Sequence, residues 1–271
     1  MAGEDEGVGP SGRSILLTHG APAPKVFVLL HGLTASPLQF LEVGRRLHAR
    51  GANVLIPTLP RHGHEDRLTT VLQHLTVAEM IAFARRAVAT ARPLGRRTIV
   101  AGFSVGGLLA AWLAQHEALD RVVPISPFLG FALVPRRVAG QAARLALRMP
   151  NRFLWWNPLL RERLMPAHGY PRYPTHAVAQ AYALAHELFA DADRVAPATP
   201  RIEFVLNRSE VVVNNRSALR LAAAWRGHGA AVRIRHLQAL PPSHDIVEPL
   251  RSSWVVPRVY PELVEAIEGV G

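Results

Sequence analysis

Six short apolar runs, separated by segments with helical periodicity, constrain the fold of this chain most strongly. They are residues 25–30, 52–59, 97–103, 121–126, 201–207 and 231–237. β-branched and other apolar residues occupy nearly every position of the first four runs, which is typical of strands buried on both faces of a parallel sheet. Strands that alternate with helices predict an α/β fold with a mostly parallel central sheet flanked by helices.

Helix signals lie between these runs and support the alternation. Residues 37–51 end at Gly51, a residue type that favours the turn after a helix. Residues 76–92 begin with Thr76 and Glu79, whose spacing predicts a capping box. Two further helices are expected at residues 216–229 and 258–269.

The alternation stops between residues 131 and 200. This stretch contains helix-like pieces, the aromatic segment 153–158 and repeated prolines, and it offers no convincing strand. A chain of 271 residues is within the range of one large domain. We therefore interpret residues 1–130 and 201–271 as one core domain, and residues 131–200 as a helical insertion in it.

Composition excludes several classes of protein. Apolar residues make up 49% of the chain and charged residues 19%, which is the profile of a packed globular protein. There is no cysteine, so disulfides, thiolate metal sites and a cysteine nucleophile are excluded. The formal net charge of +11 would attract phosphate, but the arginines are scattered as singles and pairs. Binding to nucleic acid is therefore not expected.

The N-terminal segment, residues 1–14, is acidic and polar and lacks the apolar core of a signal peptide. No run of eighteen apolar residues follows it, so no membrane-spanning helix is predicted. We expect a cytoplasmic protein without stable membrane insertion. The sequence makes no prediction of its oligomeric state.

Ser104 lies in the segment Val-Ala-Gly-Phe-Ser-Val-Gly-Gly, residues 100–107, between a predicted strand and a predicted helix. In a parallel sheet this junction is at the carboxyl edge, where ligands bind in open α/β folds. Gly102 and Gly106 leave room for a tight turn that exposes the serine hydroxyl. Free amides at the start of the helix would favour a negative oxygen there. The pattern predicts a nucleophilic serine; the alternative is a turn whose serine only caps the helix.

This segment resembles the nucleophile elbow of the α/β-hydrolase superfamily. Residues 28–40, which include His31 and Gly32, resemble the His-Gly strand end of its carboxylesterases and monoglyceride lipases. Residues 55–67 resemble their Pro-x-x-Pro-Gly-His-Gly loop, with Arg61 where the family usually has glycine. The resemblance implies an α/β-hydrolase fold in which residues 131–200 form a helical cap over the active site.

The resemblance also implies the chain order serine, acid, histidine for the catalytic side chains. Among thirteen histidines, His244 is the only one in the loop after the last predicted strand, so we expect it to be the general base. His31 is expected to fix the neighbouring loop by hydrogen bonding. A metal site at His62 and His64 lacks a third ligand at a recognisable spacing. No metal and no cofactor are expected.

Glu210 is the expected acid of this arrangement. It follows the predicted strand 201–207, at a place where the family usually has aspartate. Glutamate can also orient an imidazole, although its extra methylene requires a slightly displaced loop. Three other carboxylates remain alternatives: Asp245, Asp191 and Asp193.

The oxyanion hole is expected to consist of two backbone N–H groups, those of Val105 and Leu33. Apolar side chains of the insertion and of the segment before it are candidates for the wall of an acyl pocket. They are Phe128, Phe131, Leu133, Trp155, Trp156 and Leu159. Packing against the core is the alternative role for each of them.

These features together predict a serine carboxylic-ester hydrolase, either a carboxylesterase or a monoacylglycerol-lipase-like enzyme. Its partner would be a small-molecule ester, cleaved through a Ser-His-Glu triad and an acyl-enzyme. The same triad also serves lactonases, thioesterases, acyltransferases and C–C hydrolases, so these remain alternatives. A non-catalytic small-molecule receptor with this fold is the alternative from a different class.

Overall fold

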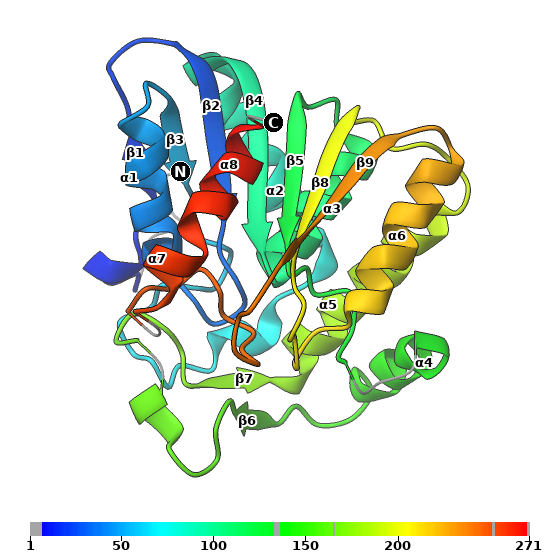
Figure 1. The fold of residues 1–271 in the computed structure, drawn as a ribbon. Helices are drawn as coiled ribbons and strands as arrows, with labels where there is room; N and C mark the ends of the chain where they lie inside the picture. The colour runs from blue at the N-terminus through cyan, green and yellow to red at the C-terminus, as the bar shows by residue number, and fades with distance from the viewer. Residues whose placement is uncertain (1–6, 133–135, 165, 251–252, 270–271) are drawn as a thin grey trace.

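The computed structural model describes residues 7–132, 136–164, 166–250 and 253–269. At its centre is a seven-stranded sheet with the order β1-β3-β2-β4-β5-β8-β9 (Figure 1). Neighbouring strands of this sheet are parallel, except for the antiparallel pair β1 and β3. The expected α/β architecture with a mostly parallel sheet is confirmed. The strands are β1 (Ile15–Leu17), β2 (Ala23–Leu30), β3 (Asn53–Ile56), β4 (Gly95–Phe103), β5 (Arg121–Ile125), β8 (Arg201–Asn207) and β9 (Ala231–Leu237).

Each of the six apolar runs overlaps a strand of this sheet. The strands β8 and β9 have the expected bounds, whereas β3 ends at Ile56, before the two prolines of the following loop. The sequence patterns do not predict the edge strand β1. It has three residues, too few to show a periodicity, and it depends on pairing with β3.

Helices cover both faces of the sheet (Figure 1). Successive residues of a strand point to opposite faces, and β2 shows the consequence. Val26, Val28 and Leu30 belong to the core cluster that includes α2, α3, α5 and α6. Phe27 and Leu29 belong to the second cluster, with α1 and α8. The helices are α1 (Leu41–His48), α2 (Val77–Ala91), α3 (Val105–His116), α4 (Arg136–Ala146), α5 (Thr175–Ala192), α6 (Asn215–Gly227), α7 (Val255–Arg258) and α8 (Tyr260–Glu268).

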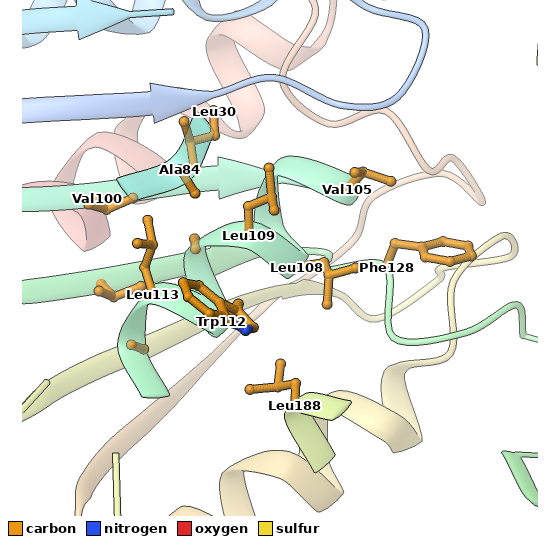
Figure 2. Packing of buried hydrophobic residues seen from close by; sticks show 14 of the residues in the cluster. Leu30, Ala84, Val100, Val105, Leu108, Leu109, Trp112, Leu113, Phe128 and Leu188 are labelled. Atoms are coloured by element: carbon orange, nitrogen blue, oxygen red, sulfur yellow. The ribbon is translucent and has the colours of Figure 1, made fainter. Parts of the chain in front are cut away.

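The helix α3, which begins directly after Ser104, is buried along nearly its whole length. Leu109 and Leu113 pack toward β2 and β4, and Leu108 and Trp112 pack toward Leu188 of α5 (Figure 2). A helix that is apolar all round belongs between other elements rather than at the surface. This packing fixes the start of α3, and with it the position of Ser104.

The described parts of residues 131–200, the inserted segment between β5 and β8, lie across the carboxyl ends of the central strands (Figure 1). They contain α4, α5 and two short antiparallel strands, β6 (Phe153–Trp155) and β7 (Arg172–Pro174). The expectation of no strand in this segment is wrong, because a pair of three-residue strands is set by contact between distant residues and leaves no local pattern. The helix α5 shares the core cluster of α3, so part of the segment packs directly on the sheet's helical layer.

Thr76 and Glu79 form the capping box that their spacing predicts. Thr76 Oγ1 accepts a hydrogen bond from the Glu79 N–H (3.2 Å), and Glu79 Oε2 accepts one from the Thr76 N–H (2.9 Å). We expect Thr76→Ala to lower the free energy of unfolding by about 1 kcal/mol, since a donor at the helix start loses its partner.

Urea denaturation would measure this change. Thr90→Ala, at an exposed position of the same helix, is the matched control and is expected to leave stability unchanged or slightly higher. Equal effects of the two substitutions would contradict a role of the capping box in stability.

Candidate active site

Ser104 occupies the turn between β4 and α3 in a strained backbone conformation, with φ 55° and ψ −114°. The turn is held on both sides, because the Ser104 N–H donates to Ile125 O (3.0 Å) and its carbonyl accepts from the Phe128 N–H (2.8 Å). Its side chain makes no capping hydrogen bond to α3. The hydroxyl is therefore free to interact with groups outside the helix.

The glycines beside Ser104 are required by close backbone contacts. A Cβ at Gly102 would overlap the carbonyl oxygen of Gly106, and a Cβ at Gly106 would overlap the carbonyl oxygen of Leu30. Any larger residue would push β2, β4 and α3 apart at this point. The pattern of residues 100–107 is thus explained by the space that the turn allows.

His244 connects Ser104 to Glu210. Its Nε2 lies 2.9 Å from Ser104 Oγ, and its Nδ1 lies 2.9 Å from Glu210 Oε2. Because a carboxylate only accepts hydrogen bonds, we assign the ring proton to Nδ1, which leaves Nε2 to accept from the serine hydroxyl. The three side chains follow the ends of β4, β8 and β9, which meet at one edge of the sheet.

The Glu210 carboxylate is buried and fully hydrogen-bonded. Its side chain has 0% exposure, and Oε1 accepts from the N–H groups of Val211, Val212 and Val213 at 2.9, 2.7 and 3.3 Å. Burial alone raises the pKa of this carboxyl, but the hydrogen bonds from His244 and from the backbone amides outweigh it, and the net shift is downward. Glu210 is held as an anion facing the imidazole.

The alternative carboxylates have other partners. Asp245 accepts hydrogen bonds from Gln39 Nε2 and from the N–H groups of Val247 and Glu248. Asp191 pairs with Arg194 and lies near His116, and Asp193 pairs with Arg220. Among these four acids, Glu210 is the one that contacts the ring of His244.

The backbone N–H groups of Leu33 and Val105 lie beside Ser104. Both residues line the small cavity at the serine hydroxyl. Within the described part of the chain, neither N–H donates to another group of the protein. The Val105 amide is the first of α3, where N–H groups have no partner within the helix. Two free donors beside a serine hydroxyl could stabilise a negative oxygen formed there.

The loop after β2, which carries Leu33, is held by two buried histidines. His31 Nε2 accepts from the Leu59 N–H (3.0 Å), and His62 Nε2 accepts from the Thr34 N–H (3.1 Å). Burial lowers the pKa of both rings, that of His62 to about 4, so both stay neutral. Both nitrogens of His62 are occupied, since Nδ1 donates to Pro60 O (2.8 Å). Among the described residues no three side chains are grouped as metal ligands.

Arg61 has a positive φ of 64°, a conformation that glycine adopts without strain. Its guanidinium binds Glu79 Oε1 through Nε (3.0 Å) and Nη2 (2.7 Å). The arginine therefore ties this loop to the start of α2 while keeping a glycine-like turn. This explains how the loop tolerates the departure from the family's usual residue.

Two cavities adjoin this site. The first, of about 10 Å³, is lined by Leu33, Ser104, Val105, Phe128, Phe131, Trp156, Val178, Ala181, Val212 and His244. The second, of about 230 Å³, is lined by Phe131, Ala142, Ala143, Ala146, Leu154, Tyr173, Thr175, Val178, Ala179 and Tyr182. Phe131 and Val178 line both, so they form the wall between the small space at Ser104 and a larger apolar space under α4.

Of the expected pocket residues, Phe128, Phe131 and Trp156 line the first cavity, but Trp155 lines neither. Side chains alternate along β6, so Trp155 points to the side opposite Leu154, and Arg161 packs over its ring. Leu159 is 93% exposed and also lies outside both cavities. Leu133 is outside the described residues.

Gln39 is a buried residue of this region that the sequence patterns do not single out. Its Oε1 accepts from the Gly32 N–H (2.9 Å), and its Nε2 donates to Asp245 Oδ2 (3.2 Å). It thereby joins the loop that carries Leu33 to the loop that carries His244. A glutamine in an amphipathic segment has no sequence signal that distinguishes it from a surface residue.

The depressed pKa of His62 predicts a loss of stability on acidification. In the unfolded chain the ring titrates at about 6.5, whereas in the folded protein its pKa is about 4. Between these values only the unfolded state binds the proton, so the free energy of unfolding falls as the pH falls. We expect His62 to account for a loss of about 2 kcal/mol between pH 7 and pH 5.

Urea denaturation at both pH values tests this. The variant His62→Gln keeps an acceptor for the Thr34 N–H and has no titrating ring, so its loss is expected to be smaller by that amount. The same pH dependence in both proteins would contradict the assignment.

Comparison with known proteins identifies a family and a relative of similar sequence. A family model described as alpha/beta hydrolase fold matches residues 25–184. The thermostable monoacylglycerol lipase of Bacillus sp. (strain H-257) is 23% identical over 192 residues, which cover 70% of this chain and 72% of that protein. None of the described helices meets the length and hydropathy required to cross a membrane.

Solved structures share the architecture at low sequence identity. One comes from work on LipS and LipT, two metagenome-derived lipolytic enzymes, with 17% identity, a TM-score of 0.69, and coverage of 95% of this chain and 99% of that chain. Another is the monoacylglycerol lipase of Paleococcus ferrophilus, with 16% identity, a TM-score of 0.65, and coverage of 94% and 99%. At these low identities, the structural likeness shows that the chains share a fold and nothing more.

Proposed function

The chain belongs to the alpha/beta hydrolase fold family, and from this premise we propose that it is a serine hydrolase of carboxylic esters with Ser104 as nucleophile. The observation that carries the proposal is the chain of contacts Ser104–His244–Glu210, 2.9 Å at each step, at a strained strand-to-helix turn. A strained turn that presents a serine to an imidazole backed by a buried carboxylate is the arrangement that activates a hydroxyl for acyl transfer.

In the proposed mechanism, His244 Nε2 takes the proton of Ser104 as Oγ attacks the ester carbonyl. Glu210 stabilises the imidazolium that forms, and the N–H groups of Leu33 and Val105 bind the oxyanion, each worth about 3 kcal/mol. His244 then returns the proton to the leaving alcohol, which leaves an acyl group on Ser104. Water, activated by the same ring, hydrolyses this acyl-enzyme and restores the serine. The proposed steps use only these side chains, the two amides and water.

The walls of the two cavities favour an apolar acyl group. Both are lined mainly by aromatic and aliphatic side chains, with Ser104 and His244 as the polar groups of the first. The similarity to the Bacillus monoacylglycerol lipase supports a substrate of that class, a small ester with an aliphatic acyl chain. We therefore favour a monoacylglycerol-lipase-like esterase. A carboxylesterase, thioesterase, lactonase or C–C hydrolase would use the same three side chains, and a non-catalytic receptor would bind such a ligand without turnover.

The proposal also assigns a role to the inserted segment and a class of partner to the protein. The inserted segment acts as a cap, since α4, β6 and β7 contribute residues to the larger cavity and lie across the carboxyl ends of the central strands (Figure 1). The partner is a small-molecule ester rather than nucleic acid, and a cytoplasmic location remains our prediction from the sequence.

Substitution of the three side chains tests the function. Ser104→Ala is expected to lower kcat for p-nitrophenyl butyrate by roughly 10⁶-fold, and Glu210→Ala by roughly 10⁴-fold, because an unoriented imidazole still accepts some protons. Ser209→Ala changes an exposed serine and serves as the control. Turnover by folded Ser104→Ala at the wild-type rate would overturn the proposal, and full activity of Glu210→Ala would assign the acid to another residue.

Phe131 is expected to limit the length of the acyl chain. Its ring packs against Phe128 and Tyr182 and closes the space at Ser104 from the apolar cavity of about 230 Å³. Phe131→Ala joins the two spaces, so we expect kcat/KM for p-nitrophenyl octanoate relative to acetate to rise about tenfold, the effect of burying roughly two more methylenes.

Trp155→Ala is the matched control for Phe131, because it also truncates an aromatic residue of the inserted segment but at a position outside both cavities. Its octanoate-to-acetate ratio is expected to equal that of the wild type. An unchanged ratio in Phe131→Ala, or an equal rise in Trp155→Ala, would contradict the role of Phe131.

A further inference from the structure

A second buried cluster of serine, histidine and glutamate lies beside the candidate active site. His168 Nδ1 is 3.0 Å from Ser36 Oγ, and His168 Nε2 is 3.1 Å from Glu248 Oε2. Ser36 is 0% exposed, and the side chains of His168 and Glu248 are 5% and 2% exposed. The cluster uses none of the residues of the proposed mechanism.

This cluster is not built as a second nucleophilic centre. Ser36 Oγ already accepts a hydrogen bond from the Leu38 N–H (3.3 Å) at the start of the 3-10 helix Pro37–Phe40. Neither Ser36 nor His168 lines either of the cavities beside Ser104. We assign the hydroxyl as the donor to Nδ1, which leaves the ring proton on Nε2, 3.1 Å from Glu248 Oε2. The contacts therefore hold segments together rather than meet a substrate.

The three residues come from three segments that surround Ser104. Ser36 lies three residues after Leu33, in the loop that follows β2. His168 belongs to the inserted segment, just before β7, and Glu248 lies four residues after His244. A single imidazole thus contacts the loop of a proposed oxyanion donor and the loop of the proposed base, while it is itself carried by the proposed cap.

Thr34 makes two further contacts between the Leu33 loop and the inserted segment. Thr34, next to Leu33, accepts hydrogen bonds from two groups of the inserted segment, the Tyr170 N–H at its carbonyl (2.7 Å) and Trp156 Nε1 at its hydroxyl (2.8 Å). Thr34 has a positive φ of 65°, a strained conformation for a β-branched residue. Strain of this kind persists only where surrounding contacts hold it. Here two of those contacts come from the inserted segment, and a third is the hydrogen bond from the Thr34 N–H to His62.

The two oxygens of the buried Glu248 carboxylate face different groups. Its Oε1 accepts from the Leu250 N–H (3.0 Å), while Oε2 faces His168 within ion-pair distance but without hydrogen-bond alignment. A buried carboxylate is costly unless a positive or hydrogen-bonding group faces it. If the inserted segment moved away, Oε2 would lose the imidazole that lies 3.1 Å from it, so the position of Glu248, and of the His244 loop that carries it, depends on His168.

We propose that His168 is a positioning residue that, through Ser36 and Glu248, couples the seating of the inserted segment to the geometry of the Leu33 amide and of His244. The inference rests on the proposed function for its catalytic consequence, but the coupling itself is a property of the fold. When the inserted segment is seated, both loops are held in the arrangement that the reaction requires. When His168 is lost, the His244 loop is no longer linked to that segment through Glu248, and the Leu33 loop is linked to it through Thr34 but not through Ser36.

Hydrogen–deuterium exchange tests the coupling without any substrate. His168→Asn retains an atom near Nδ1 for Ser36 but does not reach Glu248, and His168→Gln reaches Glu248 but not Ser36. In both, amides of residues 32–40 and 244–250 are expected to exchange at least about tenfold faster, as local opening becomes easier. Exchange in the first turns of α3 is expected to stay unchanged.

His176→Gln is the matched control. This histidine is also in the inserted segment, but its ring contacts the carbonyl of Met149, within the same segment. Exchange in residues 32–40 and 244–250 is expected to stay at the wild-type rate in this variant. Wild-type exchange in both His168 variants, or an equal increase in His176→Gln, would overturn the proposal.

Ester kinetics separate positioning from a merely structural role. We expect kcat of both His168 variants to fall about tenfold to a hundredfold with KM changed less than about twofold, because misplaced groups affect the transition state more than binding. Lower thermal stability with wild-type kcat and exchange would overturn the proposal. A wild-type protein that cleaves no ester would refute the proposed function, while the exchange comparison would still decide the coupling.

The variant Glu248→Gln tests the same coupling at the partner of His168. It keeps the side-chain volume and an oxygen for the Leu250 N–H, and it removes the buried charge, so it is expected to fold even where a His168 variant does not. The same increase in exchange in residues 32–40 and the same kcat loss are expected. Wild-type values for both would overturn the proposal.

Discussion

The strained turn at Ser104 is the constraint on which the rest of the site depends. A non-glycine residue with φ 55° and ψ −114° persists only where its surroundings leave no other conformation. Here the surroundings are the backbone of β2, which approaches Gly106, and the hydrogen bonds from Ser104 to Ile125 and Phe128. Since α3 is buried along nearly its whole length, the turn cannot relax by tilting the helix. The core packing around the sheet therefore fixes the position of the Ser104 hydroxyl.

Local patterns predict what local interactions determine. The parallel strands, the capping box of Thr76 and the turn at residues 100–107 each depend on residues close in sequence, so the amino-acid sequence alone indicates them. The prediction of Glu210 and His244 depends instead on chain order in a resembling family and not on their own surroundings. The structure brings their side chains within 2.9 Å of each other.

Contacts between distant segments leave no such signal. The strands β1, β6 and β7 have three residues each and exist through their partners. Trp155 and Trp156 are the same residue type and adjacent in sequence, yet only Trp156, the residue after β6, lines the cavity at Ser104. The polar residues Gln39, Ser36, His168 and Glu248 have no distinguishing sequence pattern. Their burial follows from loops that meet at the edge of the sheet, so only the three-dimensional arrangement reveals them.

The inserted segment contributes to the wall of the small space beside Ser104. The space at the hydroxyl measures about 10 Å³, so little water has room beside it, and electrostatic interactions there are stronger than at an open surface. The adjoining apolar cavity of about 230 Å³ offers room for a chain once Phe131 moves.

Mass spectrometry of the protein after reaction with a fluorophosphonate tests the central claim most directly, because this reagent forms a covalent adduct only with an activated serine. We predict a single adduct per chain, located by peptide mapping at Ser104, and none in folded protein with His244→Ala. An adduct at another serine, or no adduct on the folded wild-type chain, would contradict the account.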